Sequence, residues 1–187
     1  MPPISSLWIF GYGSLIWRPS YPFAEKRLAY IIGYERRLWQ GSPDHRGTPS
    51  KPGRVATLIE RDGAQCWGIA YRVAPELQES ILHELDVREQ AGYERIQPTL
   101  FDSTGKAWGQ GLAYRAGESV ATNPFFLGPK SEERIASHVA QCAGPSGSNS
   151  EYVLKLAQAL RELHVEDPHI QDVESALLRL TGEMARA

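Results

Sequence analysis

The chain has 187 residues, of which 42% are hydrophobic and 22% are charged, and its net charge is −2 at pH 7. This composition is typical of a soluble globular protein, and the near-neutral charge argues against nucleic acid or an anionic membrane surface as a partner. No apolar run is long enough to span a membrane. We expect one domain over residues 1–187, with a helical C-terminal part from about residue 131.

The cysteine content favours a cytoplasmic protein. The only two cysteines, Cys66 and Cys142, lie far apart and form no CxxC pair. A secreted protein of this size usually carries more, so a reducing compartment is expected. Residues 1–6 also lack the basic and apolar regions of a signal peptide.

Strands are expected where apolar, aromatic or β-branched runs end in turn residues. These runs are 7–10, 28–39, 54–60, 66–73, 93–101 and 107–115. Asp62-Gly63 predicts a hairpin between 54–60 and 66–73, and residues 102–105 predict a second hairpin. Pro98 should place its strand at an edge or a bulge.

Helices are expected where apolar residues recur at helical spacing behind capping or first-turn signals. Their ranges are 75–88, 131–140, 150–163 and 168–182. A strand-rich part with one inserted helix therefore precedes an all-helical part. This order predicts an α+β fold with a mostly antiparallel sheet or a small β-barrel.

A first candidate site is the segment Gly11-Tyr12-Gly13-Ser14-Leu15, called the glycine loop below. Glycines directly after a buried strand allow a sharp turn whose N–H groups can approach a carboxylate or a phosphate. We expect a positive φ at Gly13, which a β-branched residue would disfavour. The segment lacks the third glycine of a dinucleotide-binding motif and the lysine of a P-loop, and a plain tight turn remains an alternative.

Glu89 is the second candidate. Leu77, Ile81 and Leu85 step by four along the expected helix, and Glu89 is the next step. A carboxylate at the inner end of an apolar stripe, near a helix C-terminus, has a raised pKa and becomes a better base near neutral pH. The alternative is an ion pair between Glu89 and a buried arginine, since Arg88 lies near the same stripe.

Other polar residues give weaker signals. The five histidines form no metal-binding spacing, and Ser14 does not lie in a nucleophile elbow. Basic residues could together bind an acidic substrate, although such residues usually solvate the surface. They are Arg36, Arg37, Lys51, Arg54 and Arg72.

Several segments resemble the ChaC-like branch of the γ-glutamylcyclotransferases, in the order in which that family carries them. They are residues 10–17, 36–42, 44–47, 51–55, 67–72, 88–93, 126–129, 144–147 and 149–152. Each block is short, but their occurrence together from Trp8 to about Leu163 is specific. One departure is Gln90-Ala91, where the family usually has Lys and Gly.

The resemblance implies a small β-barrel with packed helices, no metal, no organic cofactor, and release of a γ-glutamyl group as 5-oxoproline. It implies that glutathione is the substrate and that Glu89 is the catalytic residue. The residues expected to bind substrate, from the loop, from the cations and from the resemblance, are Gly11, Tyr12, Gly13, Ser14, Leu15, Tyr93, Arg54, Arg72, Tyr114 and Tyr152. Two alternatives remain: an enzyme acting on γ-glutamyl amino acids or amines, and a binding module that lost activity.

Overall fold

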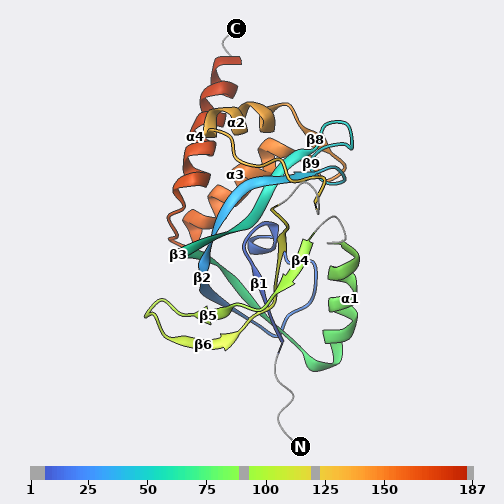
Figure 1. Ribbon diagram of the computed structural model, residues 1–187, viewed down its shortest axis with the longest axis vertical. Coiled ribbons are helices and arrows are strands. Elements are labelled where there is room, and N and C mark those ends of the chain that lie inside the picture. The colour runs from blue at the N-terminus through green and yellow to red at the C-terminus, as the bar shows by residue number, and fades with distance from the viewer. Residues whose placement is uncertain (1–6, 89–92, 119–122, 185–187) are drawn as a thin grey trace, which may run out of the picture. The chain divides into compact units, whose positions relative to one another are not determined.

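The computed structural model describes residues 7–88, 93–118 and 123–184 (Figure 1). The chain divides into two compact units, Met1–Glu35 with Leu58–Gly117 (unit 1) and Arg36–Thr57 with Glu118–Ala187 (unit 2). Unit 1 carries most of the strands, and the three C-terminal helices lie in unit 2. The expected α+β class is confirmed.

A five-stranded sheet has the order β1-β3-β2-β5-β6. Its strands are β1 (Leu7–Gly11), β2 (Glu25–Ser42), β3 (Gly53–Val73), β5 (Thr99–Phe101) and β6 (Ala107–Gln110). Strand β1 is antiparallel to β3, with Ile9 opposite Tyr71 and Gly11 opposite Ile69. This register places the end of β1, where the glycine loop begins, beside Ile69 in the C-terminal part of β3.

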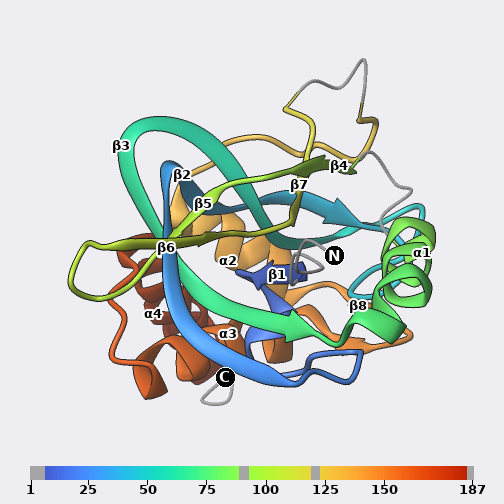
Figure 2. The same cartoon turned by 90° about the horizontal axis from the view of Figure 1, so that it is seen from below.

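The second expected hairpin is confirmed, and its first strand is interrupted at Pro98, where an edge or a bulge was expected. Strand β4 (Tyr93–Ile96) pairs with β7 (Ala113–Ala116), and β5 pairs with β6. Figure 2 shows β4 and β7 side by side. At the tip, the Asp102 carboxylate accepts hydrogen bonds from the N–H groups of Thr104 and Lys106.

The hairpin predicted at Asp62-Gly63 is wrong, because β3 continues through these residues as one strand. Gly63 does have a positive φ of 71°. A left-handed residue can bend a strand as well as reverse it, and here the chain does not reverse.

Among the described strands, the five-stranded sheet is open, with β1 and β6 as its two ends. The expectation of mostly antiparallel sheets with packed helices is therefore confirmed. The described strands do not form a closed barrel. A short link nevertheless joins β1 to Leu112, one of the two residues between β6 and β7. Leu112 forms an isolated parallel bridge with Ile9.

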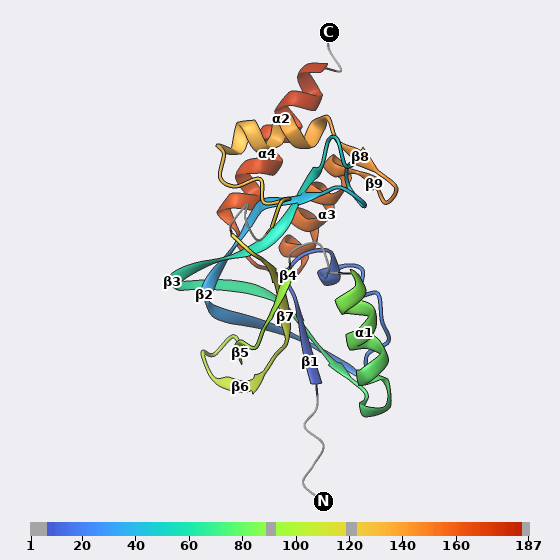
Figure 3. The same ribbon diagram turned by 45° about the vertical axis from the view of Figure 1, so that its right-hand side comes forward.

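The helix inserted in unit 1 follows its predicted amphipathic pattern. A 3₁₀ turn over Pro75–Leu77 leads into α1 (Gln78–Arg88), whose Ile81 and Leu85 are buried, whereas Glu79 is exposed. Figure 3 shows α1 on the side of unit 1 opposite the β5–β6 hairpin. Burial of this stripe fixes the helix against its own unit.

Unit 2 contains α2 (Glu132–Ala140), α3 (Asn149–Glu162) and α4 (Pro168–Met184), together with the short pair β8 (Ala143–Gly144) and β9 (Gly147–Ser148). The predicted cap at Ser131 is confirmed, because its hydroxyl accepts a hydrogen bond from Arg134 N–H. None of the helices in the described ranges is long and apolar enough to cross a membrane.

His169 is buried near the start of α4 as a neutral side chain. Leu38 N–H donates to its Nε2 at 3.1 Å, so Nε2 is an acceptor, and Nδ1 lies 3.2 Å from the Glu132 carboxylate. Burial, followed by the nearby charge of Arg37, lowers the pKa of His169, while Glu132 and Asp167 oppose this shift. Protonation of Nε2 would break the bond from Leu38.

We expect unfolding free energy to fall as the pH drops from 7.5 to 5. The folded-state pKa of His169 is lower than its unfolded value of about 6.5, so protonation favours the unfolded chain over this interval. One proton contributes a slope of at most about 1.4 kcal/mol per pH unit. Urea unfolding at several pH values should show a flatter dependence for His169→Gln than for wild type. The exposed His83→Gln should keep the wild-type slope, and an unchanged slope in His169→Gln would contradict this role.

Candidate active site

The glycine loop leaves β1 at Gly11 and closes into a 3₁₀ turn over Ser14–Ile16. Ile16 N–H donates to Gly13 O at 3.0 Å, and Arg18 N–H donates to Ser14 O at 2.8 Å. These short-range bonds define a compact turn at the end of a buried strand, as the sequence predicted.

Gly11 has a steric requirement for glycine. A Cβ atom at Gly11 would lie 2.6 Å from Leu15 Cβ, so Leu15 could not fold back over this residue. On the neighbouring strand, a Cβ at Gly68 would lie 2.3 Å from Gly11 O. The expected positive φ at Gly13 is wrong, because its φ is −120°. Close packing at Gly11 therefore constrains the path of the loop.

Two tyrosines expected at the site are joined directly. The Tyr12 hydroxyl donates to Tyr114 O at 2.5 Å, and both side chains are buried. Tyr114 lies on β7 opposite Arg95, and Tyr93 begins β4 opposite Ala116. The glycine loop and the β4–β7 ladder are thus connected within unit 1.

Tyr71 is a contact that the sequence analysis missed. From β3, its hydroxyl donates to Leu15 O at 2.7 Å and approaches Ile16 O at 3.4 Å. Burial raises the pKa of Tyr71 to about 12, so the phenol remains protonated near neutral pH. The available signal was a tyrosine at the end of the apolar run 66–71, since a buried phenol usually needs a hydrogen-bond partner.

Glu89 lies outside the described residues. The described chain reaches it from both sides, because α1 ends at Arg88 and β4 begins at Tyr93. Both elements belong to unit 1, as does the glycine loop. The catalytic role of Glu89 therefore stays a prediction from the sequence.

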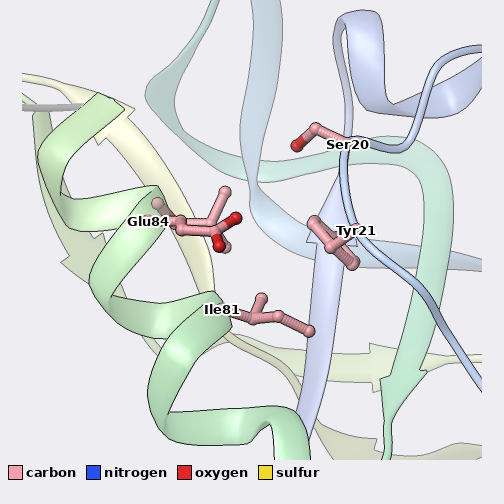
Figure 4. Close-up of a pocket in the computed structure, with 5 residues that line it drawn as sticks. Ser20, Tyr21, Ile81 and Glu84 are labelled. Carbon is pink, nitrogen blue, oxygen red and sulfur yellow. The ribbon is translucent and has the colours of Figure 1, made fainter.

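A small cavity of about 180 Å³ lies between α1 and the segment that follows the glycine loop. Ile81, Glu84 and Leu85 line it from α1, with Ser20 and Tyr21 on the other side (Figure 4). Its walls combine buried apolar side chains with a carboxylate and a hydroxyl. Tyr21 also packs edge-on against Tyr71, with ring centroids 6.1 Å apart, so the cavity wall continues toward the loop.

Arg72 and Glu25 form an ion pair in unit 1. Arg72 Nε donates to Glu25 at 3.0 Å, and Arg27 and Arg72 together lower the pKa of the Glu25 carboxyl. Arg72 directly follows Tyr71 on β3, so the two side chains leave opposite faces of the strand. The structure therefore does not bring Arg72 to the face from which Tyr71 reaches the glycine loop.

Arg54 is buried within unit 2 and bound to the backbone. Its guanidinium donates to the carbonyls of Leu38 at 2.9 Å, Gly128 at 3.0 Å and Leu127 at 3.3 Å. Burial lowers its pKa. These bonds hold three chain segments together and account for the buried cation structurally.

Tyr152 also has local contacts in unit 2. Its hydroxyl accepts a hydrogen bond from Ala56 N–H at 3.1 Å, and the Arg46 guanidinium lies 5.7 Å from its ring centre. Arg36 is paired with Asp167, and Lys51 Nζ lies 3.2 Å from Gln141 Oε1.

Of the residues predicted to bind substrate, Tyr12 and Tyr114 are in direct contact within unit 1. Arg54 and Tyr152 belong to unit 2.

Comparison with known proteins places this architecture in context. Residues 7–180 match the protein family described as ChaC-like protein. The chain is 45% identical over 179 residues to glutathione-specific γ-glutamylcyclotransferase 1 of Danio rerio, covering 93% of this chain and 90% of that protein. It is 40% identical over 176 residues to the Homo sapiens protein of the same name, covering 92% and 78%.

A solved structure is similar as well. The selenomethionine-labelled γ-glutamyl cyclotransferase specific to glutathione from yeast matches with a TM-score of 0.83 at 30% sequence identity. The match covers 94% of this chain and 96% of the yeast chain. Similarity in sequence and in fold thus extends over nearly the whole length.

Proposed function

This chain belongs to the ChaC-like protein family, and we propose that it is a glutathione-specific γ-glutamylcyclotransferase that converts glutathione into 5-oxoproline and cysteinylglycine. The observation that carries the proposal is 45% identity to the Danio rerio enzyme of that name over nearly the full length of both chains. A glutathione-specific yeast protein with a TM-score of 0.83 adds support.

The reaction needs a base and a bent substrate. The α-amine of the γ-glutamyl group attacks its own γ-carbonyl, which closes a five-membered ring and breaks the bond to the cysteine nitrogen. Because both reacting groups belong to one molecule, holding the bent conformer removes much of the entropic barrier. No covalent bond to the enzyme is required.

Glu89 is the proposed proton carrier. At neutral pH the α-amine is an ammonium ion and cannot attack, so a base must first accept its proton. The same group then returns a proton to the departing cysteine nitrogen. The proposal is supported by the resemblance around residues 88–93 and by the helical spacing that relates Glu89 to the buried Ile81 and Leu85.

The glycine loop is the proposed binding element for the γ-glutamyl group. A tight turn after a buried strand presents backbone N–H groups to an anion or to a polarised carbonyl. Support comes from the close approach of Leu15 to Gly11 and from the two phenols, Tyr12 and Tyr71, that hold the loop by hydrogen bonds. We propose Tyr93 and Tyr114 as side chains near this element.

We propose further that the five-stranded sheet closes into a small barrel through Leu112. Phe10 N–H donates to Leu112 O at 2.8 Å, and Leu112 N–H donates to Trp8 O at 2.7 Å. These bonds link β1, at one end of the sheet order, to the chain that follows β6 at the other end. Closure would fix the strand from which the glycine loop starts.

We place the protein in the cytoplasm, where glutathione is mostly reduced. Cys66 and Cys142 are both free, which suits a reducing compartment.

We expect kcat/KM for glutathione to exceed that for γ-glutamyl-cysteine and γ-glutamyl-alanine by about 10- to 100-fold. Glutathione carries a glycine carboxylate that neither dipeptide can place at the same distance. A charge-assisted hydrogen bond to such a group contributes roughly 1.5–3 kcal/mol, which corresponds to this ratio.

The test is a side-by-side measurement of kcat/KM for the three substrates, with 5-oxoproline as the product followed. If a dipeptide equals or exceeds glutathione, the specificity for glutathione is wrong, while a broader γ-glutamylcyclotransferase activity stands. Absence of 5-oxoproline from all three would point instead to a binding module of the same fold.

A further inference from the structure

We infer that Tyr71 is a positioning residue that holds the glycine loop in its substrate-binding form, an inference that rests on the proposed function. Its hydroxyl donates to Leu15 O at 2.7 Å, with Ile16 O 3.4 Å away. Tyr71 does not touch the reacting atoms in this account. It acts through the loop backbone.

The hydrogen bond from Tyr71 to Leu15 O orients a whole peptide plane and not only the carbonyl oxygen. Leu15 O and Ile16 N belong to the same planar peptide group. The oxygen is held by Tyr71, and the Ile16 N–H donates to Gly13 O at 3.0 Å. Anchoring this plane therefore orients the turn from Gly13 to Ile16, in which the binding N–H groups are proposed to lie.

The Tyr71 ring has little freedom to move. It is 2% exposed and lies on β3 opposite Ile9 of β1. Tyr21 packs against it edge-on at an interplanar angle of 88°, and Phe23 packs at 4.9 Å between ring centres. Because packing already fixes the ring, its hydroxyl has one position, and forming the hydrogen bond costs little additional side-chain entropy.

The other end of the loop has its own anchor. The Tyr12 hydroxyl donates to Tyr114 O at 2.5 Å, which ties the loop to β7. Tyr71 ties the same loop to β3 at Leu15. With two anchors on different strands, loss of either one should loosen the loop without unfolding the sheet.

The main test is Tyr71→Phe, which removes one oxygen and keeps the ring packing against Tyr21 and Phe23. Loss of this part-buried hydrogen bond should raise KM for glutathione about tenfold, with kcat changed less than about threefold. A matched control is Tyr30→Phe. Tyr30 is also buried in unit 1, and its hydroxyl forms no hydrogen bond within the described residues. This control should keep the wild-type KM.

A second variant makes the test independent of the folding of Tyr71→Phe. Phe23 is 39% exposed, so Phe23→Leu should fold normally while loosening the Tyr71 ring. It should raise KM by about two- to fivefold. The thermal midpoint of each variant separates positioning from stability, because a purely structural role would lower the midpoint and leave KM unchanged.

The outcomes distinguish this inference from the proposed function. If the wild-type protein converts glutathione and Tyr71→Phe and Phe23→Leu both keep its KM within about twofold, the positioning role is wrong and the proposed function stands. If the wild-type protein does not convert glutathione, the proposed function is wrong, and this inference is wrong with it.

Discussion

Glu89→Gln is expected to reduce kcat for glutathione by about 100- to 10,000-fold and to leave the thermal midpoint nearly unchanged. Glutamine keeps the volume of glutamate but cannot accept the ammonium proton at neutral pH. General acid–base catalysis typically contributes a rate acceleration in this range. Steady-state release of 5-oxoproline, together with thermal unfolding of the same preparations, gives both quantities.

The matched control for this variant is Glu79→Gln. Glu79 is an exposed carboxylate on α1 (Gln78–Arg88). It should keep wild-type kcat, since a solvated carboxylate takes no part in the reaction. Retention of more than about 5% of kcat by Glu89→Gln would show that another group carries the proton.

Gly11→Val is expected to lower kcat/KM by about 100-fold or more. A Cβ at this position would lie 2.6 Å from Leu15 Cβ, so Leu15 must move and the glycine loop must change its path. Displacement of a binding element by about 1 Å can cost two powers of ten in rate. The measurement is kcat/KM beside circular dichroism, which checks that the strands remain.

Gly109→Val on β6 controls for the cost of a β-branched residue in the same sheet. A Cβ at Gly109 has no atom within 4 Å, so this variant should keep wild-type kcat/KM. If Gly11→Val is folded and as active as the control, kcat/KM for glutathione does not depend on the path of the glycine loop, and its proposed binding role is wrong.

Local sequence signals predicted most elements of the fold because those elements form from local interactions. The serine cap of α2 and the apolar stripe of α1 are examples. Asp62-Gly63 failed as a hairpin signal, because a positive φ is compatible with either a turn or a bend in a strand. Pairing with distant strands determines which one forms, and a local pattern does not contain that information.

The candidate site was only partly predictable for a related reason. The position of the glycine loop follows from a short apolar run and two glycines. The partner of the Tyr71 hydroxyl does not, because Leu15 and Tyr71 are distant in sequence and meet through the pairing of β1 with β3. Arg54 illustrates the reverse case. As a cation it suggested substrate binding, whereas its guanidinium binds three backbone carbonyls.

The central claim is that glutathione is cleaved by internal attack of its α-amine, and isotope-labelled water tests it most directly. Purified protein is incubated with glutathione in H₂¹⁸O, and the products are analysed by mass spectrometry. Cyclisation predicts 5-oxoproline without ¹⁸O and an equal amount of cysteinylglycine, because water does not enter the reaction. Glutamate carrying ¹⁸O would contradict the account, since it would show that water and not the amine attacks the γ-carbonyl.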